Sequence, residues 1–407
     1  MLGVKTAALP SSLRRTNQRT VISLLLRLGM ASRADLAKAA GISQPTAGKI
    51  TTELLRLGIL QEAGSAADSA GGPDGGTRLG RPGQLLRLNA RRPRFLAIEL
   101  GVSETCLSAL PVAVELEDRW GSCFPTPKSP DAWLDMLKSV AQDWRPDQLW
   151  GVLVSVPGIV DEQAGKVLFS PNLHWLERIN LPQLLHAAWG LPVLLVQEIR
   201  ALALGHLTAE PDGEDFLLLD FGQGVGGAVV MESELFSPRI PLSGELGHTP
   251  VAGNQRRCGC GAVGCVETLV SEGGLLESFA AANGRGRTGA RASWPAFRLH
   301  VNEAGLEPWL EDTLEDTARI VAGAINVLGV RRLVITGRLA EIPACISHFT
   351  DAVRKGAIWG RFGEVLCQTA QHHRAAGLVA AGLDRLVLPT DEEAGAISAA
   401  RYAQTTA

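Results

Sequence analysis

A cluster of cysteine, histidine and glycine residues near the middle of the chain constrains the fold more than any other feature. Three of the seven cysteines fall within eight positions, and a histidine stands ten positions before the first of them. Three thiolates and one imidazole form a closed tetrahedral ligand set for zinc, and the glycines between them permit the tight turns that bring such ligands together. The alternative is a glycine-rich loop with three reduced structural cysteines. We predict a Zn²⁺ site formed by His248, Cys258, Cys260 and Cys265.

The order of residues in this cluster resembles the zinc-binding signature of the ROK family, which contains sugar repressors and sugar kinases. Residues 244–248 read Gly-Glu-Leu-Gly-His, and residues 258–267 read Cys-Gly-Cys-Gly-Ala-Val-Gly-Cys-Val-Glu, so the signature is complete without a gap. The resemblance implies that Glu245, His248 and Glu267 contact a sugar and that His248 also binds the metal. It further implies a two-lobed actin-like fold of the sugar-kinase, ribonuclease H-like type. For the two glutamates, the alternative is a solvated position in a loop.

The length and composition are those of an ordinary globular protein. A chain of 407 residues has room for two or three domains, and its 46% hydrophobic residues are enough for a sizeable core. Apolar runs such as residues 21–26 are far shorter than a membrane span, and no long apolar segment follows the N-terminal basic residues as in a secretory signal. Clustered cysteines suit metal binding in a reducing compartment better than disulfide bonds. We therefore expect a cytoplasmic protein that does not associate with membranes.

The charge is distributed unevenly along the chain. Residues 1–90 contain 12 Lys and Arg against 5 Asp and Glu, whereas the remaining residues contain 27 against 37. A basic N-terminal region on an acidic body favours an anionic polymer such as DNA as the partner of that region. A solvated basic face is the alternative interpretation.

The N-terminal region carries the pattern of three helices. Apolar residues recur with helical spacing over residues 17–28, and Ser32, with Asp35 three positions later, is a capping-box start for a short second helix. Gly41 then allows a tight turn, and Ser43 caps a third helix. A short helix, a glycine turn and a polar-faced helix predict a helix-turn-helix that presents its last helix to the major groove of operator DNA. The alternative is a generic three-helix bundle.

Two further segments predict a wing beside this helix-turn-helix. Residues 58–62 and 85–88 read as its two strands. The Gly-Arg-Pro at residues 80–82 resembles that of ROK repressor wings, where the arginine can enter the minor groove. We therefore assign residues 1–90 to a winged helix-turn-helix domain. The predicted DNA contacts are Arg33, Ser43, Gln44, Thr46, Lys49 and Arg81.

From residue 94 onward, predicted strands and helices alternate, which is the pattern of an α/β fold. The expected strands are residues 95–100, 112–117, 149–156, 191–197, 216–220 and 332–336, and the expected helices are residues 130–140, 198–207, 310–327 and 376–386. A glycine turn near the start of each half predicts two lobes with a cleft between them. We place the first lobe at residues 94–207, the second lobe with the zinc loop at residues 208–388, and a disordered tail at residues 389–407.

Two departures from the pattern of ROK kinases argue against phosphoryl transfer. Those kinases begin the first lobe with Asp-x-Gly-Gly-Thr, whereas residues 99–103 read Glu-Leu-Gly-Val-Ser, and the branched side chain of Val102 obstructs a phosphate. The kinases also carry an Asn-Asp pair whose aspartate is the general base, but here the pair is Gln197 and Glu198. A base must lie within hydrogen-bond reach of one hydroxyl, and a displacement of about 1 Å costs roughly a hundredfold. The second glycine turn, at residues 222–227, is intact.

Sugar binding can survive these changes, because glutamate still accepts a hydrogen bond from a sugar hydroxyl. Asn172 lies in a segment that resembles the Pro-Asn-Leu of the family and can add an amide; its alternative is a solvated loop residue. The predicted sugar contacts are Asn172, Gln197, Glu198, Glu245, His248 and Glu267. No motif surrounds the remaining histidines considered, which we interpret as structural or surface residues: His206, His300, His348, His372 and His373.

These features together favour a sugar-responsive transcriptional repressor of a carbohydrate-use operon. We expect it to bind zinc, operator DNA and a sugar effector, to act as a homodimer or tetramer, and to lack enzymatic activity. The first alternative is an active ATP-dependent sugar kinase with a DNA-binding head, and the second is an inactive scaffold whose head binds protein. The family contains proteins specific for xylose, glucose and N-acetylated hexosamines, and the sequence does not select among these sugars.

Overall fold

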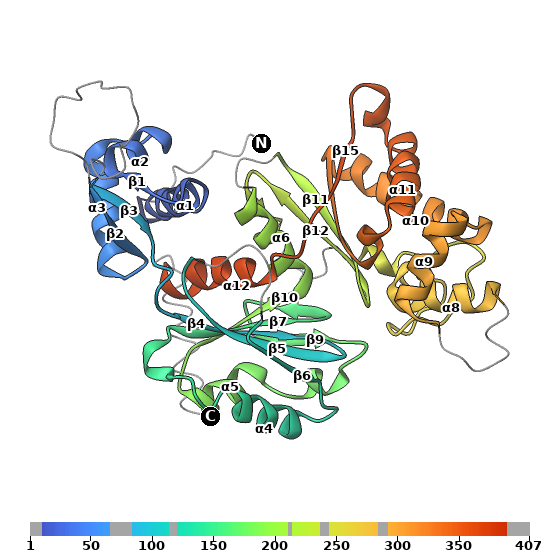
Figure 1. Ribbon diagram of the computed structural model, residues 1–407, viewed down its shortest axis with the longest axis horizontal. Coiled ribbons are helices and arrows are strands. Elements are labelled where there is room, and N and C mark those ends of the chain that lie inside the picture. The colour runs from blue at the N-terminus through green and yellow to red at the C-terminus, as the bar shows by residue number, and fades with distance from the viewer. Residues whose placement is uncertain are drawn as a thin grey trace, which may run out of the picture.

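The computed structural model describes residues 10–65, 84–113, 120–210, 214–236, 244–283 and 292–388. A small N-terminal head precedes a larger body that contains two five-stranded sheets (Figure 1). Arg81 and the predicted tail at residues 389–407 lie outside the described residues. Among the helices that are described, none has the length and apolarity needed to cross a membrane.

The head consists of three helices and a small antiparallel sheet. The helices are α1 (Pro10–Leu28), α2 (Arg33–Ala39) and α3 (Gln44–Arg56). The strands, in sheet order, are β1 (Ala31–Ser32), β3 (Gln84–Leu88) and β2 (Leu60–Ser65). The predicted caps are present, since the Ser32 side chain accepts a hydrogen bond from the Asp35 amide and Ser43 accepts one from the Thr46 amide. The two strands predicted for a wing are present as β2 and β3.

Helix α1 begins at Pro10, seven residues before the start that apolar periodicity predicts. The added turns carry polar residues whose partners lie elsewhere in the chain. Arg14 forms an ion pair with Glu53 of α3, and Arg15 forms one with Asp384 near the end of the described chain. Ion pairs between distant residues leave no trace in the spacing of apolar residues, and the start of this helix was therefore predicted too late.

The first sheet of the body has the strand order β10-β7-β4-β5-β6. Its strands are β4 (Phe95–Leu100), β5 (Glu104–Leu110), β6 (Ser122–Pro125), β7 (Gly151–Val156) and β10 (Val193–Gln197). Helices α4 (Pro130–Val140) and α5 (Leu181–Trp189) cover one face, and α12 (Arg374–Gly382) covers the other. Side chains alternate between the faces of a strand, so Phe95 and Ala97 pack toward α12, whereas Leu96 and Ile98 pack toward α4 and α5.

Strand β5 was not among the expected strands, and the strand predicted at residues 112–117 stays untested over most of its length. Val112 and Ala113 lie beyond the end of β5, and residues 114–119 are outside the described part of the chain. The apolar pattern missed β5 because Thr105, inside this strand, is polar yet fully buried. Its hydroxyl accepts a hydrogen bond from the Trp133 indole at 3.0 Å, which removes the cost of burying it.

The pairing of β5 with β6 also corrects the expectation that the cysteines stay reduced. The register places Cys106 directly opposite Cys123, and a disulfide joins them. Cross-strand neighbours lie close in space whatever their distance in sequence, so the pairing could not be read from cysteine spacing. The three clustered cysteines of the predicted metal site take no part in this bond.

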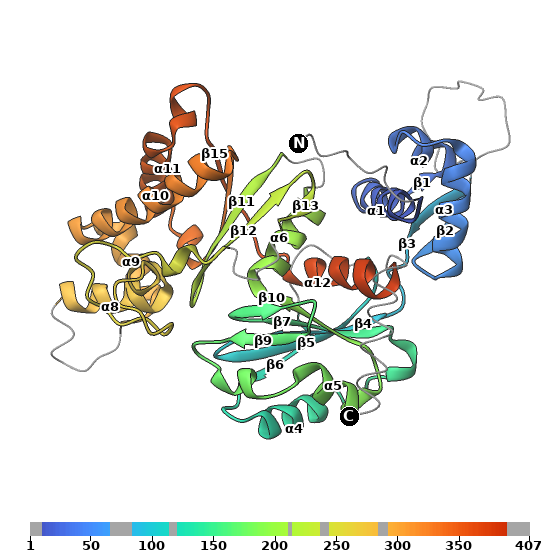
Figure 2. The same ribbon diagram turned by 180° about the vertical axis from the view of Figure 1, so that it is seen from behind.

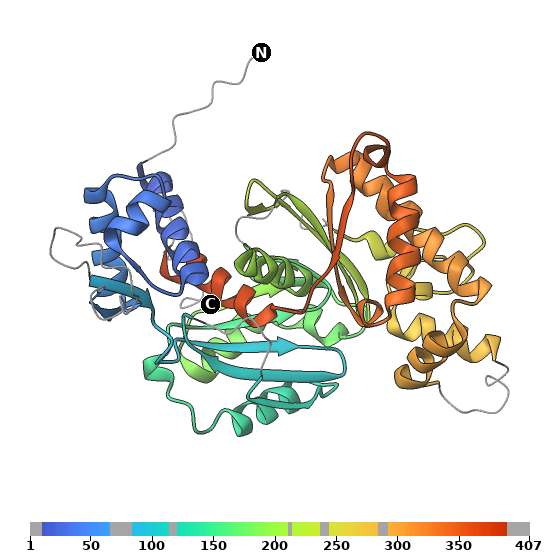
Figure 3. The same cartoon turned by 45° about the horizontal axis from the view of Figure 1, so that its top comes forward.

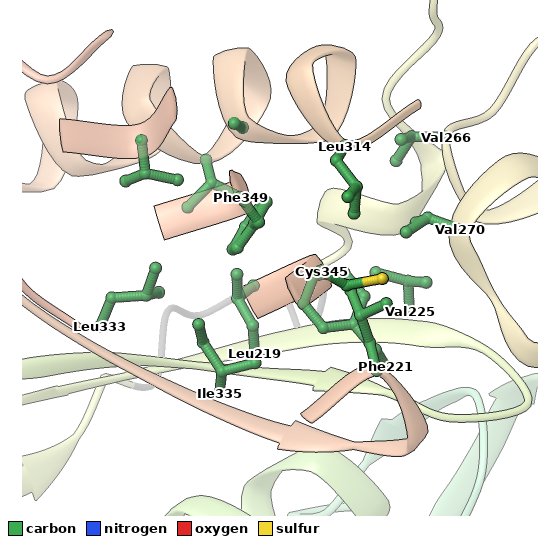
Figure 4. Close-up of a cluster of buried hydrophobic side chains, with 14 of the residues drawn as sticks. Leu219, Phe221, Val225, Val266, Val270, Leu314, Leu333, Ile335, Cys345 and Phe349 are labelled. Atoms are coloured by element: carbon green, nitrogen blue, oxygen red, sulfur yellow. The ribbon is translucent and has the colours of Figure 1, made fainter. Parts of the chain in front are cut away.

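The second sheet has the strand order β13-β12-β11-β14-β15. Its strands are β11 (Phe216–Phe221), β12 (Val225–Met231), β13 (Glu234–Leu235), β14 (Arg332–Gly337) and β15 (Leu366–Thr369), and its main helices are α6 (Glu198–Ala209), α10 (Pro308–Leu328) and α11 (Pro343–Gly356). Phe216 and Leu218 face α6. Leu219 and Phe221 face α10 and α11, where they lie beneath Phe349 (Figure 4).

Helices α6 and α12 lie between the two sheets, so the body is a stack of alternating helical and sheet layers (Figures 1 and 2). Helix α12 follows β15 of the second sheet but returns to pack on β4 and β7 of the first. The remaining elements are β8 (Ile159–Asp161) paired with β9 (Lys166–Phe169), α7 (Glu267–Val270), α8 (Glu272–Ala282) and α9 (Trp294–Ala304). The division of the body at residue 208 stays a prediction, because the chain crosses back to the first sheet at α12.

Candidate functional site

The four predicted metal ligands lie together. Their ligand atoms are all within 4.8 Å of one another. The Nδ1 atom of His248 is 3.6 Å from the Cys258 sulfur, and the sulfurs of Cys260 and Cys265 are 3.7 Å apart. In a tetrahedral zinc site with bonds of about 2.0–2.3 Å, neighbouring ligand atoms are separated by about 3.5–3.8 Å. The residues therefore fit a tetrahedral metal ion.

Backbone hydrogen bonds fold the cysteine loop back on itself. The amide of Cys258 donates to the Ala262 carbonyl at 2.8 Å, and the amide of Gly264 donates to the Arg256 carbonyl at 2.9 Å. Burial raises the pKa of the Cys258 thiol to about 12. A thiol in such a place ionises at neutral pH only beside a cation, which a bound metal would supply.

The six predicted sugar contacts line one cavity of about 1140 Å³, which opens between the two halves of the body. Asn172 follows β9, Gln197 and Glu198 stand at the end of β10 and the start of α6, and Glu267 begins α7. Glu245 and His248 belong to the short turn that precedes the cysteine loop. Tertiary structure thus brings together residues from both halves of the chain, and their role as sugar contacts stays a prediction.

Glu245 stands between the predicted metal site and the first half of the body. Its Oε1 atom accepts a hydrogen bond from Gln197 Nε2 at 3.3 Å, and its Oε2 atom lies 3.7 Å from His248 Nε2. Burial raises the pKa of Glu245, and the charge of His248 opposes that rise. Since Nδ1 of His248 faces Cys258, one imidazole ring connects the metal ligands to this carboxylate.

Glycine at position 244 is required for this arrangement. Its φ angle is +86°, and a Cβ atom there would lie 1.7 Å from the carbonyl oxygen of Gly227. The Gly227 amide donates to the Gly244 carbonyl at 2.8 Å, which fastens the turn to β12. Glu267 is held against the same strand, because its Oε2 atom accepts a hydrogen bond from the Val225 amide at 2.9 Å. The intact second glycine turn and the metal loop therefore form one packed unit.

Sequence reasoning missed a buried arginine in the cavity wall. Arg374, at the start of α12, is 5% exposed. Its Nη2 atom donates to Glu198 Oε1 at 2.8 Å, and its Nη1 atom pairs with Glu99. Both glutamates stand where the kinase pattern has aspartate, so the two departures converge on one cation. No motif around Arg374 identifies it in the sequence. The replacement of two aspartates of the kinase pattern by Glu99 and Glu198 was the only available sign that these two side chains share a partner.

His372, interpreted from the sequence as a structural or surface residue, also lines this cavity. Its Nε2 atom is 2.8 Å from Asp220 Oδ1, and the Thr336 hydroxyl donates to the same oxygen at 2.8 Å. Burial by itself would raise the pKa of Asp220, but the hydrogen bond and charge of His372, with the charge of Arg374, hold that pKa below its usual value. Asp220 is the second-last residue of β11, so the cluster lies next to the second glycine turn.

The two glycine turns contact each other across the cleft. Gln223 of the second turn donates from Nε2 to the Ser103 hydroxyl of the first turn at 2.7 Å. Val102, the residue that replaces a glycine of the kinase pattern, lines the same cavity. Side chains thus bridge the two glycine turns.

In the head, α3 presents a polar face and buries an apolar one. Gln44 and Lys49 are exposed, whereas Ala47, Ile50 and Leu54 are buried. The other predicted contacts are partly engaged within the head: Ser43 Oγ lies 2.8 Å from Thr46 Oγ1, and Arg33 donates to the Thr51 hydroxyl at 3.2 Å. Two cations that the sequence analysis did not select, Arg14 and Arg56, line one shallow hollow together with Lys49.

A family model described as ROK family matches residues 95–383. The chain belongs to the ROK family. This confirms the resemblance carried by the metal-loop segments, and the match begins where the head ends. The xylose repressor of Caldicellulosiruptor bescii is 28% identical over 346 residues, which cover 81% of this chain and 84% of that protein. The N-acetylmannosamine kinase of Salmonella typhimurium is 33% identical over 181 residues, 44% of this chain and 62% of the kinase.

Solved structures of ROK proteins show the same fold. A ROK family transcriptional regulator, described as a homologue of the E. coli MLC protein, superposes with a TM-score of 0.69 at 20% identity and covers 95% of this chain and 98% of its own. A ROK glucokinase from Streptomyces griseus, in complex with glucose and AMPPNP, superposes with a TM-score of 0.56 at 21% identity over 70% of this chain and 97% of its own. These likenesses confirm the predicted α/β, sugar-kinase-like fold. The regulator also matches through the region of the head.

Proposed function

We propose that this ROK protein is a sugar-responsive DNA-binding transcriptional regulator, acting as the repressor of a carbohydrate-use operon. The proposal rests on two features that occur in the same chain. The head has a helix-turn-helix pattern whose α3 exposes a polar face, and the cavity of the body is lined by all six candidate sugar contacts. The similarity to a xylose repressor extends over most of both chains, which supports this assignment over that of a kinase. Operator recognition by paired heads implies a homodimer or tetramer, and DNA as partner implies the cytoplasm.

We further propose that His248, Cys258, Cys260 and Cys265 hold Zn²⁺. A closed set of four protein ligands is typical of a structural zinc, which contributes folding energy and leaves no open position for catalysis. The role of the ion would be to fix the loop and, through His248, the position of Glu245. The domain limits given above and the binding of sugar by Asn172, Gln197, Glu198, Glu245, His248 and Glu267 belong to the same proposal.

The cavity wall argues that this protein does not phosphorylate its sugar. Glu198, at the position of the general base, is engaged by the buried guanidinium of Arg374, so its Oε1 atom is already occupied and not free to accept the proton of a sugar hydroxyl. Val102 and the Gln223–Ser103 bridge belong to the two glycine turns, which would have to cradle the phosphates in a kinase. We expect no ATP-dependent phosphorylation of xylose, glucose or N-acetylmannosamine above background, measured by ADP release with a ROK hexokinase as positive control. Robust formation of a sugar phosphate would establish the alternative, an active kinase with a DNA-binding head.

DNA binding is tested by removing one exposed cation of α3. Lys49→Ala is expected to weaken binding to DNA selected by the native protein from a random library, by about tenfold for one lost contact. It should also make the dependence of log K on log salt shallower by about one unit. Arg81→Ala, in the predicted wing, is expected to act in the same way. Binding is measured by fluorescence anisotropy over a salt series.

The matched control for this test is Lys138→Ala. Lys138 is exposed on α4, on the face of the first sheet that points away from the head (Figure 1). This control should leave both affinity and salt dependence unchanged. If Lys49→Ala and Arg81→Ala also leave the affinity and its salt dependence unchanged, the winged helix-turn-helix is not the DNA-binding element. The second alternative, a scaffold whose head binds protein, would then be supported.

A further inference from the structure

Glu162, which follows β8, connects the sugar cavity to the end of the described chain. Its side chain is 13% exposed. The Oε1 atom accepts hydrogen bonds from the Gln197 amide at 2.9 Å and from Arg200 Nε at 3.0 Å. The Oε2 atom accepts one from Arg385 Nη1 at 2.9 Å, and the Glu162 carbonyl accepts one from Arg385 Nη2 at 2.8 Å. Gln197 reaches Glu245 with its side chain, so one residue touches both the cavity and Glu162.

The residue beside Arg385 is fastened to the head. Asp384 and Arg385 lie in the same turn, Leu383–Val387, which directly follows α12. The carboxylate of Asp384 accepts hydrogen bonds from Arg15 Nε at 3.0 Å and also pairs with Arg19, both on α1. The views of Figures 2 and 3 agree that the helices of the head lie beside α12. Hydrogen bonds therefore connect Glu245 through Gln197 and Glu162 to Arg385. Asp384, which precedes Arg385 in the same turn, continues the connection to α1 through the backbone.

Arg19 gives this series a second attachment, on the other sheet. Its Nη1 atom lies 3.2 Å from Glu234 Oε1 of β13. Asp384 follows α12, which packs on the first sheet, whereas Glu234 belongs to the second. A change in the angle between the sheets alters the separation of these two carboxylates. Arg19 spans both carboxylates in the arrangement described, so a change in their separation would alter how α1 is held.

We propose that Glu162, Arg385 and Asp384 form the relay by which a sugar in the cavity changes the docking of the DNA-binding head. This inference rests on the proposed function and assigns its regulation to named positioning residues. A sugar that takes the hydrogen bonds of Gln197 and Glu245 acts on the end of β10 and the start of α6, where Glu162 is bonded. A ligand shifts the equilibrium between two ways of docking the head only if it binds one of them more tightly than the other. In this proposal, the contacts of the relay are those that change between the two.

The relay is tested in the full-length protein with Asp384→Asn and Glu162→Gln. Each replacement keeps the shape of the side chain and removes the charge that the arginines share. The probe is whichever of D-xylose, D-glucose and N-acetyl-D-mannosamine raises the melting temperature of the native protein. The measured quantity is the ratio of the DNA dissociation constants with and without that sugar. Typical coupling between two sites changes an affinity by about 5- to 150-fold; we expect each variant to bring the ratio close to one.

Three controls separate coupling from damage to either site. Asp384→Asn should bind DNA without sugar within about threefold of the native affinity and should still be thermally stabilised by sugar, since Asp384 does not line the cavity. The double variant should lose no more coupling than each single variant, because residues of one chain of contacts are not additive. Glu210→Gln, which removes the partner of the buried Arg332 outside the relay, should keep the native ratio.

The outcomes distinguish the relay from the function on which it rests. If the native protein binds both DNA and sugar but its DNA dissociation constant is the same with and without sugar, the proposed regulation is overturned, and this inference with it. A native ratio that differs clearly from one and persists in both variants overturns the relay alone. Loss of the ratio in Glu210→Gln as well would mean that any weakened ion pair uncouples the sites, and would equally overturn it.

Discussion

Replacement of Cys258 by serine is expected to release the metal and to loosen the loop that holds Glu245 and His248. The four ligand atoms lie within 4.8 Å of one another, so the loss of one thiolate leaves an incomplete set around the ion. Structural zinc is bound with an apparent free energy of about 10–16 kcal/mol in small zinc domains, and the removal of one ligand should lower the affinity by several orders of magnitude. Native protein purified without chelator should contain about one zinc per chain by elemental analysis.

Cys367→Ser is the matched control for this prediction. Cys367 is an unpaired cysteine on β15, away from the ligand cluster. It should keep the native zinc content and melting temperature, whereas Cys258→Ser should lose both the ion and the response to sugar. Native protein that contains no zinc would refute the assignment of the metal. Full zinc content in Cys258→Ser would show instead that this thiol is not a ligand.

The grouping of the four candidate metal ligands was predictable because these residues are close in sequence. His248 and the three cysteines lie within one loop, so spacing and residue type already restrict how they can meet. The starts of α2 and α3 were predictable for a similar reason, since the capping contacts of Ser32 and Ser43 join residues three positions apart. The apolar strand β4 was placed at its observed limits, because a run buried on both faces has an unmistakable composition.

The interactions that the sequence did not predict join residues far apart in the chain. Arg374 and Glu99 are separated by 275 positions, and Arg15 and Asp384 by 369. Neither pair carries a periodic or local signal, because any arginine can in principle meet any carboxylate. The sequence shows that Glu99 and Glu198 depart from the kinase pattern, but it does not show that the buried Arg374 contacts both carboxylates. Such compensation becomes visible only when the strands and helices are placed in space.

Replacement of Glu245 by alanine is expected to abolish the response to sugar while leaving DNA binding intact. Its carboxylate lies between Gln197 and His248, each of which contacts one of its oxygens. A hydrogen bond to a charged group contributes about 1.5–3 kcal/mol, so the loss of one such bond to a sugar hydroxyl should weaken sugar binding about 10- to 150-fold. Sugar affinity is measured by calorimetry and DNA affinity by anisotropy. Glu104→Ala, an exposed carboxylate at the edge of the same cavity, serves as control.

The separation of the two readouts makes the Glu245→Ala experiment decisive. Glu245 belongs to the body, so its loss should not alter α3 or the affinity for DNA measured without sugar. Two heads in a dimer must reach half-sites about one helical turn apart, or a multiple of it, and a modest change in their spacing is enough to weaken binding. If sugar releases the native protein from the operator, the variant should stay bound at the same sugar concentrations. If sugar acts as a corepressor, it should not increase the affinity of the variant for the operator. A normal sugar response in Glu245→Ala would overturn the assignment of the cavity, because the carboxylate that connects the metal loop to Gln197 would then have no part in sensing the sugar.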